Sequence, residues 1–215
     1  MTYYLRQMCK DDITQVTDID REAFPTQWPP PNYVNELRNQ TARYYVVCDG
    51  GGANRQEIKT APAGGLISRL RRFFNSSTSS GQELSANREC IIGFIGSWIM
   101  ADEAHITSIA VREAYRRQGI GEMMMISAIE MAMKLKADIL TLEVRVSNTG
   151  AQNLYTKYGF TQVGRRKGYY TDNREDAFIM STDKITTPAF QARFQQLKED
   201  FSKRRASTVK STPPE

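Results

Sequence analysis

The sequence is constrained most by a turn with two closely spaced glycines, Gly119 and Gly121, between an apolar run and a long helical pattern. The apolar run, residues 105–111, alternates like a strand, and residues 119–136 repeat apolar side chains at helical spacing. Glycines here allow a tight change of direction and a close approach of backbone N–H groups to a ligand. A strand followed closely by a helix, with strand patterns on both sides, predicts a mixed α/β domain.

The same turn is suited to bind a phosphate group. The first turn of a helix has unpaired N–H groups and the positive end of the helix dipole, so it stabilises an anion. Arg116 and Arg117 precede the glycines and would add positive charge. The alternative is that Gly119 and Gly121 only permit the strand to turn into the helix, because short glycine motifs often occur by chance.

The rest of the chain alternates between strand and helix patterns. We expect strands over residues 2–8, 44–48, 91–100, 105–111, 139–144, 160–166 and 177–182, and helices over 13–24, 33–37, 119–136, 149–158 and a terminal stretch from Phe190 to Phe201. These patterns and the length of 215 residues predict one domain, residues 1–185. Residues 186–215 would add an amphipathic helix and a disordered tail. Whether that helix packs on its own domain or forms a dimer contact is left open, and with it the oligomeric state.

Residues 50–88 differ from their surroundings and predict an inserted, flexible loop. The segment is rich in Gly, Ser, Asn and Ala, a composition that cannot bury a core. Within it, Leu66, Leu70 and Phe74 follow helical spacing beside several arginines, which makes a short basic amphipathic stretch. Disorder or loose packing on its own domain is favoured over contact with an anionic surface such as a membrane or ribosomal RNA.

The positive charge of the chain lies mainly outside the predicted domain core. The formal net charge is +5. Residues 50–88 hold six basic and two acidic residues, and residues 186–215 hold six basic and three acidic residues, so the remaining body is about neutral. A basic groove that follows a nucleic-acid backbone is therefore not expected in the body.

Other features predict a soluble, cytoplasmic protein. No apolar stretch is long enough to span a membrane, and the start of the chain lacks the apolar centre of a signal peptide. Cys9, Cys48 and Cys90 are an odd number without CxxC spacing, so neither a disulfide framework nor a structural zinc site is expected. We expect no metal.

Three sequence blocks resemble one known family, the Gcn5-related N-acetyltransferases (GNAT). The turn RRQGIG fits the RxxGxG signature that grips the pyrophosphate of acetyl-CoA in that family. The blocks LEVRVSNTGAQNLYTKYGF at 142–160 and RRKGYYTDNREDAFIM at 165–180 resemble the bacterial RimI type, whose members acetylate ribosomal-protein N-termini. The likeness covers residues 1–183 apart from the insertion. It implies the GNAT fold, a mixed and mostly antiparallel sheet, flanked by helices, whose parallel fourth and fifth strands splay around acetyl-CoA.

The resemblance assigns a role to each matching residue. Those expected to bind acetyl-CoA are Ile109, Ala110, Val111, Arg116, Arg117, Gln118, Gly119, Ile120, Gly121, Asn148 and Tyr155. Glu143 takes the position of the general base, acting through water, and its apolar strand neighbours would raise its proton affinity. Its structural alternative is an ion pair with Arg145 or Arg112. Tyr155 takes the position of the acid that protonates the departing thiolate, with Tyr158 as the competing phenol.

Further expectations concern the surroundings of these catalytic residues. A backbone N–H within 109–111, where the two parallel strands splay, would hold the oxyanion. Asn148 would bind amides of the cofactor, cap the following helix, or do both. The only histidine, His105, has no evident partner in the sequence and is expected to be structural. No covalent intermediate is expected, because no cysteine lies in a matching motif.

The amine acceptor would bind between Phe24 with Pro25 and an aromatic pair, Tyr169 and Tyr170. In related N-terminal acetyltransferases such a pair closes over the first residues of a peptide. Beyond Pro25 this chain has Thr, Gln, Trp and three prolines in place of a short FPWS turn, which leaves substrate choice open. We expect transfer of acetyl from acetyl-CoA to a protein N-terminus, with the N-terminal alanine of a small-subunit ribosomal protein as the candidate. The alternatives are an acetyltransferase for a small amine or a lysine side chain, and a non-catalytic acyl-CoA-binding scaffold.

Overall fold

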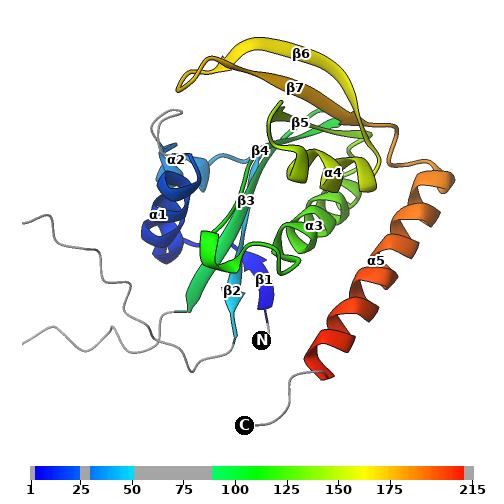
Figure 1. The fold of residues 1–215 in the computed structure, drawn as a ribbon, viewed down its shortest axis with the longest axis horizontal. Helices are drawn as coiled ribbons and strands as arrows, with labels where there is room; N and C mark the ends of the chain where they lie inside the picture. The colour runs from blue at the N-terminus through cyan, green and yellow to red at the C-terminus, as the bar shows by residue number, and fades with distance from the viewer. Residues whose placement is uncertain (1–2, 25–29, 51–88, 211–215) are drawn as a thin grey trace, which may run out of the picture.

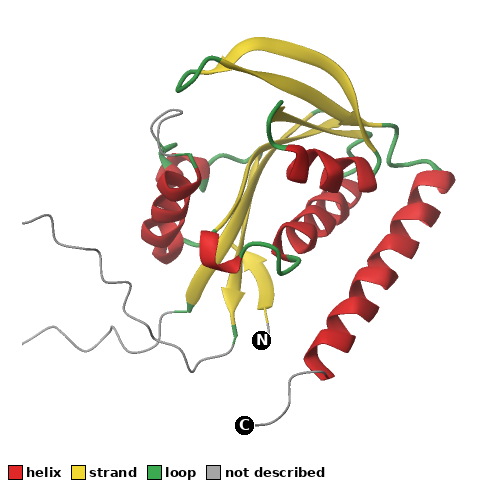
Figure 2. Ribbon diagram, viewed as in Figure 1, coloured by secondary structure: helices red, strands yellow, loops and turns green. Residues whose placement is uncertain are grey.

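The computed structural model describes residues 3–24, 30–50 and 89–210, which form one seven-stranded sheet with helices on both faces (Figures 1 and 2). The strands are β1 (Tyr3–Gln7), β2 (Ala42–Asp49), β3 (Cys90–Met100), β4 (Glu103–Val111), β5 (Ile139–Arg145), β6 (Phe160–Tyr170) and β7 (Glu175–Thr182). The helices are α1 (Ile13–Ala23), α2 (Tyr33–Glu36), α3 (Ile120–Lys134), α4 (Thr149–Lys157) and α5 (Pro188–Lys210), with 3-10 turns at Lys10–Asp12 and Glu113–Tyr115. The mixed α/β prediction is confirmed, and β6 continues beyond the expected residue 166.

The strand order is β1-β2-β3-β4-β5-β7-β6. All neighbouring strands are antiparallel except β4 and β5, which are parallel. A parallel pair needs a crossover connection, and here the glycine turn and α3 provide it. The predicted mostly antiparallel sheet with a parallel pair of fourth and fifth strands is therefore confirmed.

The two faces of the sheet pack against different helices. On the α1 face, Val16 and Tyr33 are buried against Phe94 of the sheet. On the α3 face, Met124 and many other apolar residues of α3 and α4 pack on side chains such as Leu142. Figure 1 shows α1 and α2 on one side of the strands and α3 and α4 on the other. Because successive side chains of a strand point to opposite faces, each strand contributes alternate residues to the two cores.

Helix α5 packs on the α3 side of the molecule, beyond α3 and α4 in Figure 1. It begins at Pro188, which is favourable in a first turn, and the hydroxyl of Thr187 accepts a hydrogen bond from the Phe190 N–H at 3.3 Å. Phe194 and Phe201 are buried in the core cluster of α3. The apolar stripe of this helix thus contacts its own chain.

Some expectations concern parts of the chain outside the described residues. The insertion at 50–88 lies there, apart from Gly50, and so do Pro25 and residues 211–215. In the described ranges, none of the helices has both the length and the apolar character needed to cross a membrane.

Candidate active site

The site begins where the parallel strands β4 and β5 separate. They pair from Glu103 opposite Ile139 to Ile106 opposite Leu142, and the pairing ends there. Beyond this point β4 continues along β3 and β5 continues along β7. A register shift in the β3–β4 pairing falls at Thr107 and bends β4 at the same place. The predicted splay is present, and it starts just before the expected residues 109–111.

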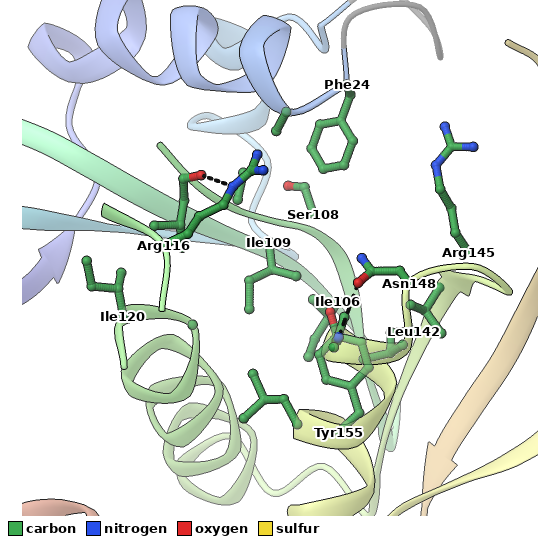
Figure 3. Close-up of a pocket in the computed structure, with 18 of the residues that line it drawn as sticks. Phe24, Ile106, Ser108, Ile109, Arg116, Ile120, Leu142, Arg145, Asn148 and Tyr155 are labelled. Carbon is green, nitrogen blue, oxygen red and sulfur yellow. Dashed lines mark hydrogen bonds between the residues drawn. The ribbon is translucent and has the colours of Figure 1, made fainter. Parts of the chain in front are cut away.

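A cavity of about 750 Å³ lies at this splay and is lined from both faces of the sheet (Figure 3). Among its lining residues are most of those expected from the sequence: Phe24, Ile109, Ala110, Val111, Arg116, Arg117, Gly119, Ile120, Gly121, Glu143, Asn148, Tyr155, Tyr169 and Tyr170. Tertiary folding therefore brings residues from β4, β5, β6, α4, the glycine turn and the end of α1 to one cavity. Gln118 does not line it.

The glycine turn presents backbone to the cavity. Gly119 is the N-cap of α3, with a φ of +80° that favours glycine and no side-chain cap. The next residues, Ile120 and Gly121, line the cavity with the start of the helix. The Arg116 side chain folds back, and its Nε donates to the carbonyl oxygen of Val111 at 3.3 Å (Figure 3). This geometry suits the binding of an anion.

The side chain of Gln118 bonds away from the cavity. Its Oε1 accepts a hydrogen bond of 2.5 Å from the hydroxyl of Tyr3, and its Nε2 donates to the carbonyl oxygen of Ala114 at 3.3 Å. The side chain anchors the turn to β1 instead of facing the cavity. A sequence motif cannot reveal this contact, because Tyr3 is distant in the chain.

Tyr155 reaches the cavity from α4, on the α3 face (Figure 3). It is 5% exposed, and this burial raises the pKa of its phenol, so the hydroxyl keeps its proton at neutral pH. Tyr158, the competing phenol, instead donates a 2.8 Å hydrogen bond to Glu122. At the start of α4 the side chain of Asn148 accepts from the Ala151 N–H at 3.2 Å, so its capping role is present.

Glu143 reaches the cavity from β5, on the opposite α1 face. Its strand neighbours Leu142 and Val144 belong to the α3-face core, so alternation directs Glu143 to the other side. Its carboxylate lies 3.3 Å from His105 Nε2 and 3.0 Å from Arg166 Nε. The expected partners, Arg145 and Arg112, pair with other carboxylates.

These contacts correct two expectations. The hydrogen bond with His105 lowers the pKa of Glu143 most, and Arg166 lowers it further, against a burial that alone would raise it. The prediction that apolar neighbours would raise its proton affinity is therefore wrong, because the hydrogen bond from His105 on β4 and the charge of Arg166 on β6 outweigh the effect of burial. His105 also has a partner, contrary to the sequence-based expectation.

His105 belongs to a chain of polar contacts along the α1 face. Its Nδ1 lies 2.8 Å from the hydroxyl of Thr141, and that hydroxyl donates to the carboxylate of Glu103. His105 and Thr141 are register partners across β4 and β5. The alternation of side chains along a strand could have placed His105 and Thr141 on the same face, but only if β4 and β5 had been known to be neighbours.

The aromatic pair from β6 also lines the cavity. The rings of Tyr169 and Tyr170 are 5.2 Å apart and nearly perpendicular, and the Arg145 guanidinium lies 3.9 Å from the centre of the Tyr170 ring. Arg145 also pairs with Asp172 at 2.8 Å and Glu175 at 3.2 Å. The β6–β7 hairpin is thereby fixed beside the end of β5.

Ser108 is a lining residue that the sequence did not reveal. Its Oγ is buried, and among the described residues it is the one buried side-chain nitrogen or oxygen without a hydrogen-bond partner. Figure 3 shows it on the cavity wall near Phe24. An unpaired buried hydroxyl costs about 1–3 kcal/mol, so a ligand group that bonds to it would be favoured.

Comparisons with known proteins agree with this geometry. The sequence model of the acetyltransferase (GNAT) family matches residues 56–160. A Bacillus subtilis protein named "Putative [ribosomal protein bS18]-alanine N-acetyltransferase" is 34% identical over 176 residues, which cover 82% of this chain and 92% of that protein. An N-alpha-acetyltransferase of Sulfurisphaera tokodaii is 32% identical over 83% of this chain and 92% of its own length.

A solved structure has the same fold. The crystal structure of the ribosomal-protein-S18-alanine N-acetyltransferase from Escherichia coli matches with a TM-score of 0.60 at 22% identity, covering 85% of this chain and 94% of that one. The chain belongs to the GNAT family of acetyltransferases. Within that family it is an acetyl-CoA-dependent N-alpha-acetyltransferase.

Proposed function

We propose that the chain transfers acetyl from acetyl-CoA to the N-terminal α-amino group of a protein, with Glu143 as base and Tyr155 as acid. The candidate substrate is the N-terminal alanine of a small-subunit ribosomal protein, as in the names of the Bacillus subtilis and Escherichia coli relatives. One observation carries the proposal: Glu143 and Tyr155 line the same cavity from opposite faces of the splayed sheet. Acetyl-CoA, when bound, supplies an acetyl group activated as a thioester.

The residues of the cavity fit acetyl-CoA. The uncapped start of α3, with Gly119 in a left-handed conformation, offers N–H groups to the pyrophosphate, and Arg116 and Arg117 lie at the same wall. Residues 109–111 run past the splay and would hold the amide-containing arm by their backbone. Asn148 would add a side-chain amide while it caps α4. An N–H of 109–111 would face the acetyl oxygen as charge develops there.

Glu143 would hold the acceptor amine and take its proton. A free α-amino group has a pKa of about 7.7–8.0, so part of it is already neutral at cytosolic pH. A carboxylate with a lowered pKa is a weak base toward an ammonium ion, but the nitrogen becomes far more acidic as the new C–N bond forms. Glu143 can then accept the proton, directly or through water.

Tyr155 would give its proton to the departing sulfur. Its raised pKa keeps the phenol protonated until the thiolate forms beside it. Its place on α4 puts the hydroxyl on the cofactor side, across the splay from Glu143. The acetyl group would then lie between the base and the acid, as a direct transfer requires.

The acceptor would enter over the α1 face. Phe24, Ser108 and the Tyr169–Tyr170 pair line that part of the cavity, and the hairpin of β6 and β7 lies beside it. Aromatic walls favour a thin, extended N-terminus over a bulky amine. Ser108 would donate to a carbonyl oxygen or accept from an N–H near the peptide start.

The proposal is tested by mass spectrometry of peptides incubated with the purified protein and acetyl-CoA. The panel contains peptides that start with Ala, Ser, Met and an acidic residue, each also with an internal lysine. We expect acetylation of the α-amino group, strongest on an alanine start, and none in Glu143→Gln over the same time. Acetylation confined to lysine side chains would contradict the N-terminal substrate, and no acetylation of any peptide would favour a scaffold.

A further inference from the structure

The C-terminal half of α5 packs on the glycine turn that precedes α3. Phe201 is 8% exposed, and a Cβ atom added to Gly119 would lie 3.3 Å from the edge of its ring. Such a contact is tighter than an ordinary van der Waals approach, so the ring lies directly on the backbone of the turn. The position of the turn therefore depends on α5 as well as on α3.

A carboxylate lies next to the turn. Glu122 is in the first turn of α3 and lines the cavity. Burial raises its pKa, but hydrogen bonds from Lys157 and Tyr158 and the charges of Lys157 and Arg204 outweigh burial, so the net pKa is lowered. A charged carboxylate is favourable at a helix N-terminus, but it repels any second anion that binds there.

Two cations from other elements neutralise Glu122. Lys157 Nζ, at the end of α4, lies 2.5 Å from Glu122 Oε1, and Arg204 Nη2, on α5, lies 2.7 Å from the same oxygen. Two positive charges and one negative charge leave the group with a net charge of about +1, which attracts a phosphate. Without Arg204 the net charge would be about zero.

A second set of contacts fixes the other side of the turn. The Arg205 guanidinium donates to the carbonyl oxygen of Tyr3 at 3.2 Å and lies 3.1 Å from Met123 Sδ. The hydroxyl of Tyr3 in turn holds Gln118 at 2.5 Å. The turn is thus held between β1 and α5.

We propose that α5 is part of the acetyl-CoA site of this enzyme. Phe201 holds the turn in the conformation that binds pyrophosphate, and Arg204 cancels the charge of Glu122 so that the turn accepts an anion. This inference rests on the proposed function, because it takes the turn as the pyrophosphate site. Docking of α5 and binding of coenzyme A then stabilise each other, since each favours the same arrangement of the turn. Phe201 and Arg204 are positioning residues and touch no reacting atom.

The charge is tested with Arg204→Ala in the full chain, with the dissociation constant of coenzyme A measured by calorimetry. We expect binding about five- to tenfold weaker, with kcat at saturating acetyl-CoA unchanged. The matched control is Lys198→Ala, which removes another α5 cation paired with an α3 carboxylate, Glu130, at 2.8 Å. Glu130 lies about two helical turns beyond Glu122, so this control should leave the affinity unchanged.

A double variant separates charge from packing. If Arg204 acts by cancelling Glu122, then Glu122→Gln in the Arg204→Ala background restores the affinity to near the wild-type value. If Arg204 only held α5 in place, the second substitution would not restore the affinity for coenzyme A. The inference is overturned if Arg204→Ala binds coenzyme A as tightly as the wild type, or if the double variant stays as weak as the single one.

The packing is tested with Phe201→Ala, or with the milder Phe201→Leu should the alanine variant fail to fold. The control is Phe190→Ala, because Phe190 packs in the same way on another left-handed glycine, Gly159, with a distance of 3.0 Å to a Cβ built there. Both variants should lower the melting temperature, but only the Phe201 variant should weaken coenzyme A binding, by about tenfold.

The outcomes separate this inference from the function on which it rests. Equal weakening by the Phe201 and Phe190 variants, or no weakening by the Phe201 variant, contradicts a role of α5 in the site. A wild-type protein that fails to bind coenzyme A contradicts the proposed function itself.

Discussion

The two faces of the splayed sheet build their halves of the site from different groups. On the α3 face the cavity wall combines the backbone at the uncapped start of α3 with the buried phenol of Tyr155 and the side chain of Glu122. On the α1 face Glu143 lines the cavity, and its carboxylate is held by two side chains, His105 at 3.3 Å and Arg166 at 3.0 Å. Backbone groups are fixed before a ligand arrives, whereas ion pairs must rearrange when a substrate ammonium enters.

Each property of the enzyme should therefore depend on a different face of the sheet. Affinity for acetyl-CoA should depend on the backbone of the turn and on the elements that hold it. Recognition and deprotonation of the acceptor should depend on the charges around Glu143. Substitutions at the turn should therefore change the affinity for acetyl-CoA, whereas substitutions around Glu143 should change kcat or the KM for the peptide.

The largest effect is expected for Glu143→Gln, on the α1 face. The amide keeps the shape of the side chain but cannot accept the amine proton, so kcat should fall about 10²- to 10⁴-fold. The affinity for coenzyme A should change little, because the change lies across the sheet from the turn. Steady-state kinetics and calorimetry measure the two quantities, and equal losses in both would remove the contrast between the faces.

Tyr155→Phe, on the α3 face, should lower kcat by about 10²-fold, at the low end of the range for proton transfer. The loss is smaller because a thiol is acidic enough to leave partly unassisted. Rapid-mixing assays at saturating acetyl-CoA measure this step. Tyr158→Phe is the control, since Tyr158 bonds to Glu122 and not to the reacting group. If Tyr158→Phe lowers kcat as much as Tyr155→Phe does, the proposal that Tyr155 is the acid is contradicted.

His105→Gln should change the pH dependence more than the maximal rate. Glu143 would act in its ionised form, and the groups that interact with it are His105 on β4 and Arg166, Tyr169 and Tyr170 on β6. Loss of His105 removes the largest cause that lowers the pKa of Glu143, so this pKa rises. The acid-side fall in kcat/KM should therefore move to higher pH, measured with one peptide for both proteins. If the acid-side fall in kcat/KM stays at the same pH, or moves to lower pH, His105 does not lower the pKa of Glu143.

The smallest effect is expected for Arg166→Ala. Its guanidinium forms an ion pair with the Glu143 carboxylate, which the acceptor ammonium would also approach. Removal of this competing cation should therefore lower the KM for the peptide. A half-exposed pair is worth up to about 1 kcal/mol, hence a change of at most about fivefold. Arg165→Ala is the matched control, because Arg165 has the same exposure, 53% against 54%, but pairs with Asp176. A higher KM in Arg166→Ala would mean that Arg166 binds the acceptor.

Features that depend on near neighbours in the chain could be predicted from the sequence. The period of apolar residues gave the strands and helices, and the two glycines gave the turn at the start of α3, because these depend on neighbours within a few residues. The same holds for the motif positions of Glu143 and Tyr155, which the structure brings to one cavity while their catalytic roles stay predictions.

The partners that set the properties of those residues come from distant parts of the chain and could not be predicted in this way. His105 and Arg166 reach Glu143 from two other strands, and Phe201 and Arg204 reach the turn from a helix about 80 residues further along the chain. Strand order, register and helix docking fix such contacts, and none of these follows from local periodicity. For that reason the sequence could predict that Glu143 reaches the site, but it predicted a raised proton affinity where the partners of Glu143 lower its pKa.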